Sequence, residues 1–235
     1  LEERTHSFDK IYEGIRRFIF GLGKKILIAN TMGAFVASAS SLTDKSVLLY
    51  WMLAIAVGFQ IYFDFSGYSD MAIGLGKIFG FDFLENFNYP FISRSITDFW
   101  RRWHISLGSW FRDYVYIPLG GSKCSKARSF FNIFMVWFLT GFWHGAEWNF
   151  ILWGLYFWIV LMIEKKFFMS FLKKSKICSH LYVLVIVLIS FIIFNSSSLN
   201  EIIVSVRAMF GGNGLPLSSA STIYYVRSYA VLFII

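Results

Sequence analysis

Residues 46–63 read SVLLYWMLAIAVGFQIYF, an apolar run without a charged residue. Further apolar runs suited to crossing a bilayer occur at about 26–42, 130–143, 147–163 and 177–194, and a sixth begins near Thr222. A full crossing takes about 20 helical residues, so several of these runs are short. The sequence therefore predicts an all-α polytopic membrane protein, a bundle of transmembrane helices with re-entrant or interfacial helices.

The composition agrees with lipid as the solvent. Hydrophobic residues make up 57% of the 235 residues, aromatic residues 21% and charged residues 15%. Soluble domains carry about 25% charged residues. A single water-soluble core of this size would not hide so many aromatic side chains, which excludes an ordinary soluble domain.

The charges predict one topology. The net charge is +8, from 22 Lys and Arg against 14 Asp and Glu. The cations lie between apolar runs, as in cytoplasmic loops of membrane proteins and not as in a nucleic-acid binder. The basic segments 1–25, 91–129 and 164–180 are each separated by two apolar runs. All three are expected on the cytoplasmic side, with the links near Asp44, His144 and Asn195 facing outward.

The cysteines and chain ends support two further expectations. Cys124 and Cys178 lie in lysine-rich stretches, so we expect reduced cytosolic thiols and no disulfide. The sequence begins without methionine and stops within the apolar run 230–235. We expect a piece of a longer protein.

The apolar hairpin 130–163 presents a histidine at its turn. Its first arm of about 14 residues spans about 21 Å as a helix, against a hydrocarbon core of about 30 Å. A polar turn at membrane depth is tolerated where it is buried in protein or lines a cavity. We expect His144 to be recessed in a pit, where a neutral imidazole can act as a general base. Position alone leaves open an interfacial histidine bonded to a carbonyl.

Residues 95–116 predict a single interfacial helix. Apolar side chains recur at spacings of three and four and form one stripe: Ile96, Trp100, Trp103, Leu107, Trp110 and Tyr114. His104 flanks this stripe, with Gly108 one turn later. It either faces a cavity open to the cytosol or is an ordinary surface histidine.

The segment 60–76 starts as a span and becomes polar. Gly67, Gly74 and Gly76 permit either a break in the backbone or the close approach of another helix. Asp64 and Asp70 either form a proton path or pair with Arg or Lys, and we favour pairing.

Several other site types lack their sequence signatures. His144 and Glu147 are three residues apart, but no second pair exists to complete a metal site, so we expect no metal. There is no G-x-S-x-G elbow and no H-E-x-x-H motif. Five residues after His104 and His144 stand Ser109 and Asn149, so the H-x4-D pattern of glycerolipid acyltransferases is missing.

Four blocks together resemble the membrane-bound O-acyltransferase (MBOAT) family. They are residues 62–74 (YFDFSGYSDMAIG), 85–90 (ENFNYP), 95–107 (SITDFWRRWHISL) and 141–145 (GFWHG). The resemblance extends from about residue 21 to residue 163. It implies one partial membrane-embedded acyltransferase domain over 1–235 with a family-like core at 21–163.

The resemblance assigns roles to residues. Within the family the chain is similar to the bacterial polysaccharide branch, typified by the alginate O-acetyltransferase membrane subunit. His144 matches the family's catalytic histidine and His104 its second characteristic one. We also predict five substrate-binding residues: Arg101, Arg102, Trp103, Trp143 and Asn149. For the two arginines, contact with lipid headgroups is the competing interpretation.

The implied reaction joins two sides of a membrane. We expect acetyl transfer from a cytosolic thioester, acetyl-CoA or a carrier-protein thioester, toward hydroxyls of an extracellular polysaccharide, with no bound cofactor. Expected partners are membrane lipid and the polysaccharide, reached through a secreted acyltransferase, in a bacterial inner or plasma membrane. The alternatives are D-alanyl or other acyl transfer to teichoic acid, peptidoglycan or a lipid, and a transporter with a proton relay.

Overall fold

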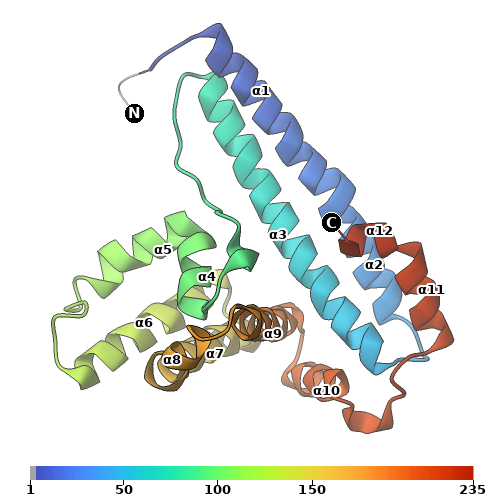
Figure 1. The fold of residues 1–235 in the computed structure, drawn as a ribbon. Coiled ribbons are helices and arrows are strands. Elements are labelled where there is room, and N and C mark those ends of the chain that lie inside the picture. The colour runs from blue at the N-terminus through green and yellow to red at the C-terminus, as the bar shows by residue number, and fades with distance from the viewer. Residues whose placement is uncertain (1–3, 235) are drawn as a thin grey trace. The chain divides into compact units, whose positions relative to one another are not determined.

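The computed structural model describes residues 4–234, which form helices and connecting loops without a β-strand (Figure 1). The chain divides into two compact units. The first contains the residues up to Glu85 and those from Ile203 onward, and the second contains Asn86–Ile202. The all-helical prediction is confirmed.

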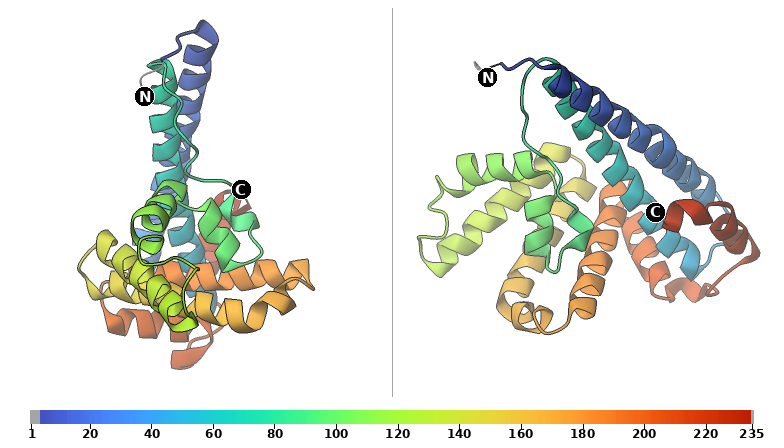
Figure 2. Two further views of the ribbon diagram at one scale, coloured as in Figure 1. Left: turned by 90° about the vertical axis from the view of Figure 1, so that its left-hand side faces the viewer. Right: turned by 45° about the horizontal axis from the view of Figure 1, so that its top comes forward.

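The first unit is built on two long helices. α1 (Phe8–Gly23), a π-helical turn (Lys24–Ala29) and α2 (Asn30–Ser40) form one continuous helix, and α3 (Val47–Ile78) runs antiparallel beside it (Figure 2). Residues 8–25 of the predicted basic segment 1–25 are helical and do not form a loop between spans; residues 1–3 lie outside the described residues. Ser7 accepts a hydrogen bond from the Lys10 backbone N–H and Asp9 lies in the first turn, and both features favour a helix start here.

Glycines let these two helices touch. A Cβ on Gly14 would lie 2.6 Å from the Gly74 carbonyl oxygen, and one on Gly67 would lie 2.7 Å from that of Gly21. α3 continues unbroken through Gly67, Gly74 and Gly76. Of the two alternatives left open by the sequence, the structure therefore has close approach and not a break.

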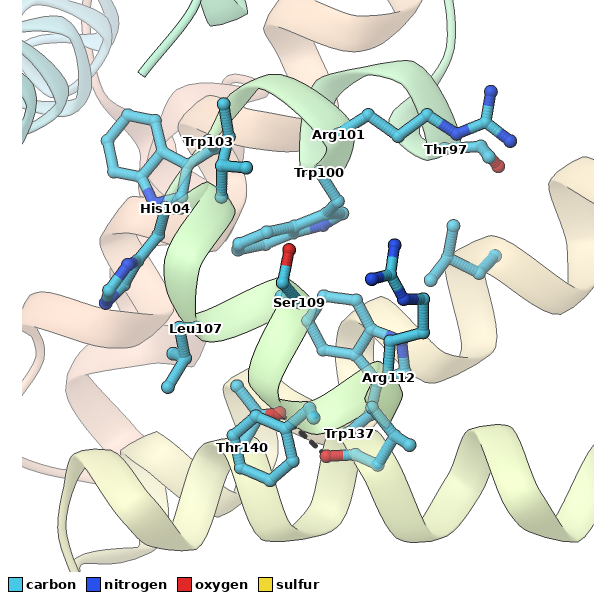
Figure 3. A pocket seen from close by; sticks show the side chains of 15 residues that line it. Thr97, Trp100, Arg101, Trp103, His104, Leu107, Ser109, Arg112, Trp137 and Thr140 are labelled. Atoms are coloured by element: carbon cyan, nitrogen blue, oxygen red, sulfur yellow. Dashed lines mark hydrogen bonds between the residues drawn. The ribbon is translucent and has the colours of Figure 1, made fainter. Parts of the chain in front are cut away.

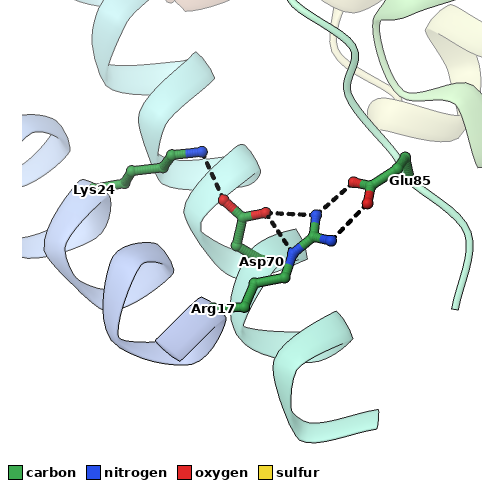
Figure 4. Close-up of polar contacts among 4 residues, drawn as sticks. All are labelled: Arg17, Lys24, Asp70 and Glu85. Carbon is green, nitrogen blue, oxygen red and sulfur yellow. Dashed lines mark hydrogen bonds and ion pairs between the residues drawn. The ribbon is translucent and has the colours of Figure 1, made fainter. Parts of the chain in front are cut away.

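An ion-pair network lies between these contacts (Figure 4). Asp70 on α3 accepts from Arg17 at 2.9 Å and from Lys24 at 2.6 Å, both on the long N-terminal helix. The Arg17 guanidinium also donates two hydrogen bonds to the Glu85 carboxylate, one of them from Nη1 to Oε1 at 2.5 Å. Lys25 pairs with Asp64 at 2.5 Å. Pairing of both aspartates is thereby confirmed.

The C-terminal helices pack on the other end of this pair. They are α10 (Leu199–Met209), α11 (Ala220–Ser228) and α12 (Ala230–Ile234), with a 3₁₀ turn at Gly212–Gly214. Three aromatic rings of this C-terminal segment contact the ring of Phe35 in α2 edge-on: Tyr225 of α11, Tyr229 between the two helices, and Phe233 of α12. The sixth apolar run is thus divided between two short helices.

The second unit holds the remaining helices. In chain order they are a 3₁₀ turn (Pro90–Ile92), α4 (Ile96–Arg102), α5 (Ile105–Phe111), a π turn (Arg112–Tyr116), α6 (Lys126–His144), α7 (Trp148–Ile163), a π turn (Glu164–Phe168), α8 (Met169–Leu172) and α9 (Lys176–Asn195). α6 and α7 form a hairpin closed by glycines, because a Cβ on Gly154 would lie 2.3 Å from the Trp137 carbonyl oxygen.

Within residues 4–234, three helices are long and apolar enough to cross a membrane: Phe8–Ser40, Val47–Ile78 and Lys176–Asn195. They include residues 26–40 of the predicted span 26–42, residues 47–63 of the span 46–63, and all of the span 177–194. The spans 130–143 and 147–163 are helical, as α6 and α7, but do not meet the same criteria of length and hydropathy.

The first arm of the α6–α7 hairpin is longer than predicted. α6 has 19 residues, about 28 Å at 1.5 Å per residue. The predicted first arm of about 14 residues is therefore too short, and arm length no longer supports a recessed His144, whose depth stays a prediction.

Candidate functional site

His104 lies at a break between two helices. The prediction of one helix over 95–116 is wrong: α4 ends at Arg102, Trp103 is extended, and α5 starts at Ile105. His104 itself has φ 46° and ψ 55°. A left-handed backbone is rare for a non-glycine residue and costs about 1–3 kcal/mol, so the surrounding contacts must hold it.

Asn86 supplies those contacts. Its backbone carbonyl accepts from the Ile105 N–H at 3.0 Å, and Asn88 donates to the Arg102 carbonyl at 2.9 Å. The side-chain Oδ1 of Asn86 accepts from the Ser106 N–H at 3.2 Å and from the Ser106 hydroxyl at 2.9 Å. The same oxygen lies 3.2 Å from His104 Nδ1. Because an amide oxygen only accepts, this contact selects the His104 tautomer with its proton on Nδ1.

The charge state of His104 follows from its surroundings. Burial, and to a smaller extent the nearby His144, lowers the pKa of His104 to about 4. The group is therefore neutral at physiological pH. A neutral imidazole is the form that accepts a proton.

His144 is the last residue of α6, and rings surround it. The centroids of Trp143, Trp153, Phe194 and Phe150 lie 4.9, 5.1, 5.2 and 6.4 Å from that of its imidazole. Among the described residues we find no hydrogen bond to either ring nitrogen. A Cβ on the next residue, Gly145, would lie 2.6 Å from the Phe150 ring, which explains the glycine there.

Trp143 connects the two histidines. Its ring lies 6.1 Å from that of His104 and 4.9 Å from that of His144, edge-on to both. Trp143 itself is 58% exposed. One exposed aromatic side chain therefore contacts both imidazoles.

A cavity of about 550 Å³ lies next to His104, enclosed by α4, α5, α6 and Leu161 of α7 (Figure 3). Trp100, Trp103 and Trp137 form its apolar walls. The guanidinium groups of Arg101 and Arg112 lie at one end and His104 at the other (Figure 3). The cavity is mostly apolar with a few placed polar groups, which is typical of small-molecule sites.

The other predicted substrate-binding residues have structural contacts. Arg102 pairs with Asp98 at 3.1 Å, and Asn149 donates to the Phe194 carbonyl at 2.8 Å. Trp103 stacks on Phe99, with centroids 5.4 Å apart. The structure thus brings His104, Trp103 and Arg101 to one cavity and His144 next to it through Trp143, whereas Arg102 and Asn149 do not line this cavity. The substrate-binding roles stay predictions.

Sequence reasoning missed three groups around this site. Asn86 was visible only as part of a motif block, and Arg112 only as one of several basic residues. Glu164 was hidden in a basic stretch, yet none of its side chain is exposed. No set of three or more His, Cys, Asp or Glu side chains within residues 4–234 is arranged to hold a metal ion.

Comparison with known proteins identifies clear relatives. The sequence model of the membrane-bound O-acyltransferase family matches residues 3–204. A probable alginate O-acetylase of Azotobacter vinelandii is 42% identical over 93% of this chain and 44% of its own length, and one of Pseudomonas aeruginosa is 50% identical over 70% and 32%. A peptidoglycan O-acetyltransferase of Helicobacter pylori is 36% identical over 92% and 42%. The chain thus spans less than half the length of each of these relatives.

Proposed function

Because the chain belongs to the membrane-bound O-acyltransferase family, we propose that it is part of an O-acetyltransferase that modifies an extracellular polysaccharide. The relatives named as alginate O-acetylases are 42% and 50% identical, against 36% for the one named for peptidoglycan. The observation that carries the proposal is the pair of imidazoles that both contact Trp143, one of them lining the cavity.

His144 is the general base of this reaction. Its imidazole takes the proton of the acceptor's hydroxyl group while that oxygen attacks the thioester carbonyl. The tetrahedral intermediate then collapses, the C–S bond breaks, and the proton passes to the departing thiolate. The products are an acetyl ester and a free thiol. Supporting this role, His144 is enclosed by rings and is not tied to a fixed partner among the described residues.

The cavity beside His104 holds the acyl donor. A cytosolic thioester such as acetyl-CoA, or a carrier protein with a phosphopantetheine arm, presents phosphate and a narrow, flexible arm that ends in the thioester. Arginine suits phosphate because its planar fork donates two parallel hydrogen bonds. Arg101 and Arg112 line the same end of the cavity, and of the two Arg112 already pairs with Asp113, at 2.7 Å. Arg101 is therefore the main phosphate contact.

The acceptor reaches His144 from the opposite side of the membrane. α6 begins at Lys126, beside the basic segment assigned to the cytoplasm, and ends at His144. α6 thus separates His144 from the basic residues next to Lys126, whereas Arg101 of the same segment lines the cavity beside His104. Transfer onto the finished polymer involves a secreted partner acyltransferase, and the enzyme sits in the bacterial cell membrane.

The test uses the full-length protein in its own cell. His144→Ala is expected to reduce polymer ester content to that of a gene deletion while the amount of protein in the membrane stays normal. His6→Ala, which removes an exposed imidazole from the first unit, is the matched control and keeps normal ester content. Full acetylation by the His144 variant would refute the assignment.

A second acceptor is supported by the relative from Helicobacter pylori, whose match covers 92% of this chain. Ester analysis of both exopolysaccharide and peptidoglycan in a deletion strain distinguishes the two. If the deletion strain loses esters only from peptidoglycan, then peptidoglycan and not the exopolysaccharide is the acceptor.

A further inference from the structure

Glu164 is the only Asp, Glu, Lys or Arg side chain that is fully buried among the described residues, with 0% exposed. None of the ion pairs found among residues 4–234 includes it. Its carboxylate instead accepts from the backbone N–H groups of Ile96 at 2.6 Å and Thr97 at 3.0 Å, and from the Thr97 hydroxyl at 2.6 Å. A buried charge of this kind is stable only when such bonds compensate it.

These bonds complete the start of α4. The first four N–H groups of a helix have no partner within the helix. Here Glu164 accepts from those of Ile96 and Thr97, and the Ser95 hydroxyl accepts from that of Asp98 at 3.0 Å. The negative charge also lies at the positive end of the helix dipole. Glu164 is therefore a capping group supplied by a different helix.

The helix that supplies Glu164 is itself fixed in place. Glu164 opens the π turn that follows α7, and the Tyr182 phenol of α9 lies against its carboxylate. Along the same pair of helices, Tyr156 donates to the Ile186 carbonyl at 2.9 Å. Asn149 closes the far end through Phe194. α7 and α9 thus form a rigid base for the carboxylate.

α4 has seven residues, so fixing its start largely fixes its whole course. It carries Trp100 and Arg101 into the cavity wall and ends one residue before the turn at Trp103–His104. We infer that Glu164 is a positioning residue, which anchors α4 and thereby sets where Arg101 and His104 stand around the donor. This inference rests on the proposed function of the cavity as the donor site.

The first test needs no activity. Hydrogen exchange of the full-length protein in detergent measures the protection of the Ile96 and Thr97 amides. Glu164→Gln keeps the shape but turns one acceptor into a donor that faces N–H groups, so we expect at least tenfold faster exchange there. Glu201→Gln is the matched control: this exposed carboxylate accepts from the Ser197 N–H and hydroxyl at 2.8 Å each. Unchanged exchange at residues 96 and 97 in Glu164→Gln overturns the inference.

The second test separates positioning from simple loss of folded protein. With acetyl-CoA as the probe donor, Glu164→Gln is expected to raise its KM about tenfold at matched amounts of folded protein. A destabilised but correctly arranged enzyme would lose Vmax in proportion to folded protein and keep its KM, and that result also overturns the inference.

A milder variant covers the case in which Glu164→Gln does not fold. Thr97→Val removes one hydrogen bond and leaves both backbone bonds to Glu164 intact. It is expected to shift the exchange at residues 96 and 97 and the KM in the same direction by a smaller factor, and no shift in either counts against the inference. If the wild-type protein transfers no acetyl group, the proposed function fails, whereas the exchange measurement still decides the anchoring.

Discussion

His104 and His144 both touch Trp143, but the rest of their surroundings differ in kind. His104 has a left-handed backbone conformation, and the amide oxygen of Asn86 lies 3.2 Å from its Nδ1. His144 ends a regular helix among aromatic rings. One imidazole is held by polar contacts in one orientation and one tautomer, and the other is held by packing alone.

The difference indicates a division of labour. A group that gives and takes a proton in turn must not lose a partner each time it changes charge, which fits the ring-enclosed His144. A group that orients a substrate benefits from a fixed tautomer and a fixed direction, which fits His104. Strained backbone is expected where such orientation matters.

The largest expected effect comes from exchanging each imidazole for an amide. His144→Gln should lower kcat/KM for acetyl transfer by about 10²–10⁴-fold, the usual loss for a general base. His104→Gln should lower it by only about tenfold, because glutamine can still donate to Asn86. Assays on membranes with equal protein content measure both. Equal losses would remove the proposed division of labour.

The sequence predicted the elements of this site better than its geometry. Apolar runs and motif blocks placed the helices, because hydrophobic length and spacing act locally. The break at His104 was missed because the spacing of Trp100, Trp103 and Leu107 continues across it. What interrupts the helix is pairing with Asn86 and Asn88, which are distant in sequence. Glu164 was missed for the same reason, since its partners lie 67 and 68 residues away.

The contacts that hold His104 give the next largest effect. Asn86→Leu removes the acceptor of the Ser106 N–H and hydroxyl and the contact with Nδ1, each worth about 0.5–1.5 kcal/mol. We expect a loss of about tenfold to thirtyfold in kcat/KM. Asn86→Asp keeps the acceptor and should lose less. If both variants behave alike, Asn86 does not act through its oxygen.

Trp143 should give a smaller effect, and Trp148 at the start of α7 is a matched control. The two side chains are 58% and 71% exposed, but only Trp143 contacts both histidines. Trp143→Phe reduces the area of contact with the two imidazole rings and should lower kcat/KM about threefold to tenfold. Trp148→Phe should leave it within about twofold, and equal effects would show that Trp143 acts as an ordinary surface aromatic residue. These factors correspond to about 0.7–1.4 kcal/mol.

The last expected effect is on stability at low pH and not on the rate of transfer. The pKa of His104 is lowered to about 4 in the folded protein, whereas the unfolded value is about 6.5. Between these values the unfolded chain binds a proton that the folded chain does not. The folded protein therefore keeps its full stability with respect to His104 above about pH 6.5, and loses stability as the pH falls toward 4, because protonation then favours the unfolded chain. In detergent, the wild-type Tm should fall more between pH 7 and pH 5 than that of His104→Gln. A parallel fall in both proteins would mean that His104 is not kept neutral by its surroundings, and the contrast with His144 would then rest on geometry alone.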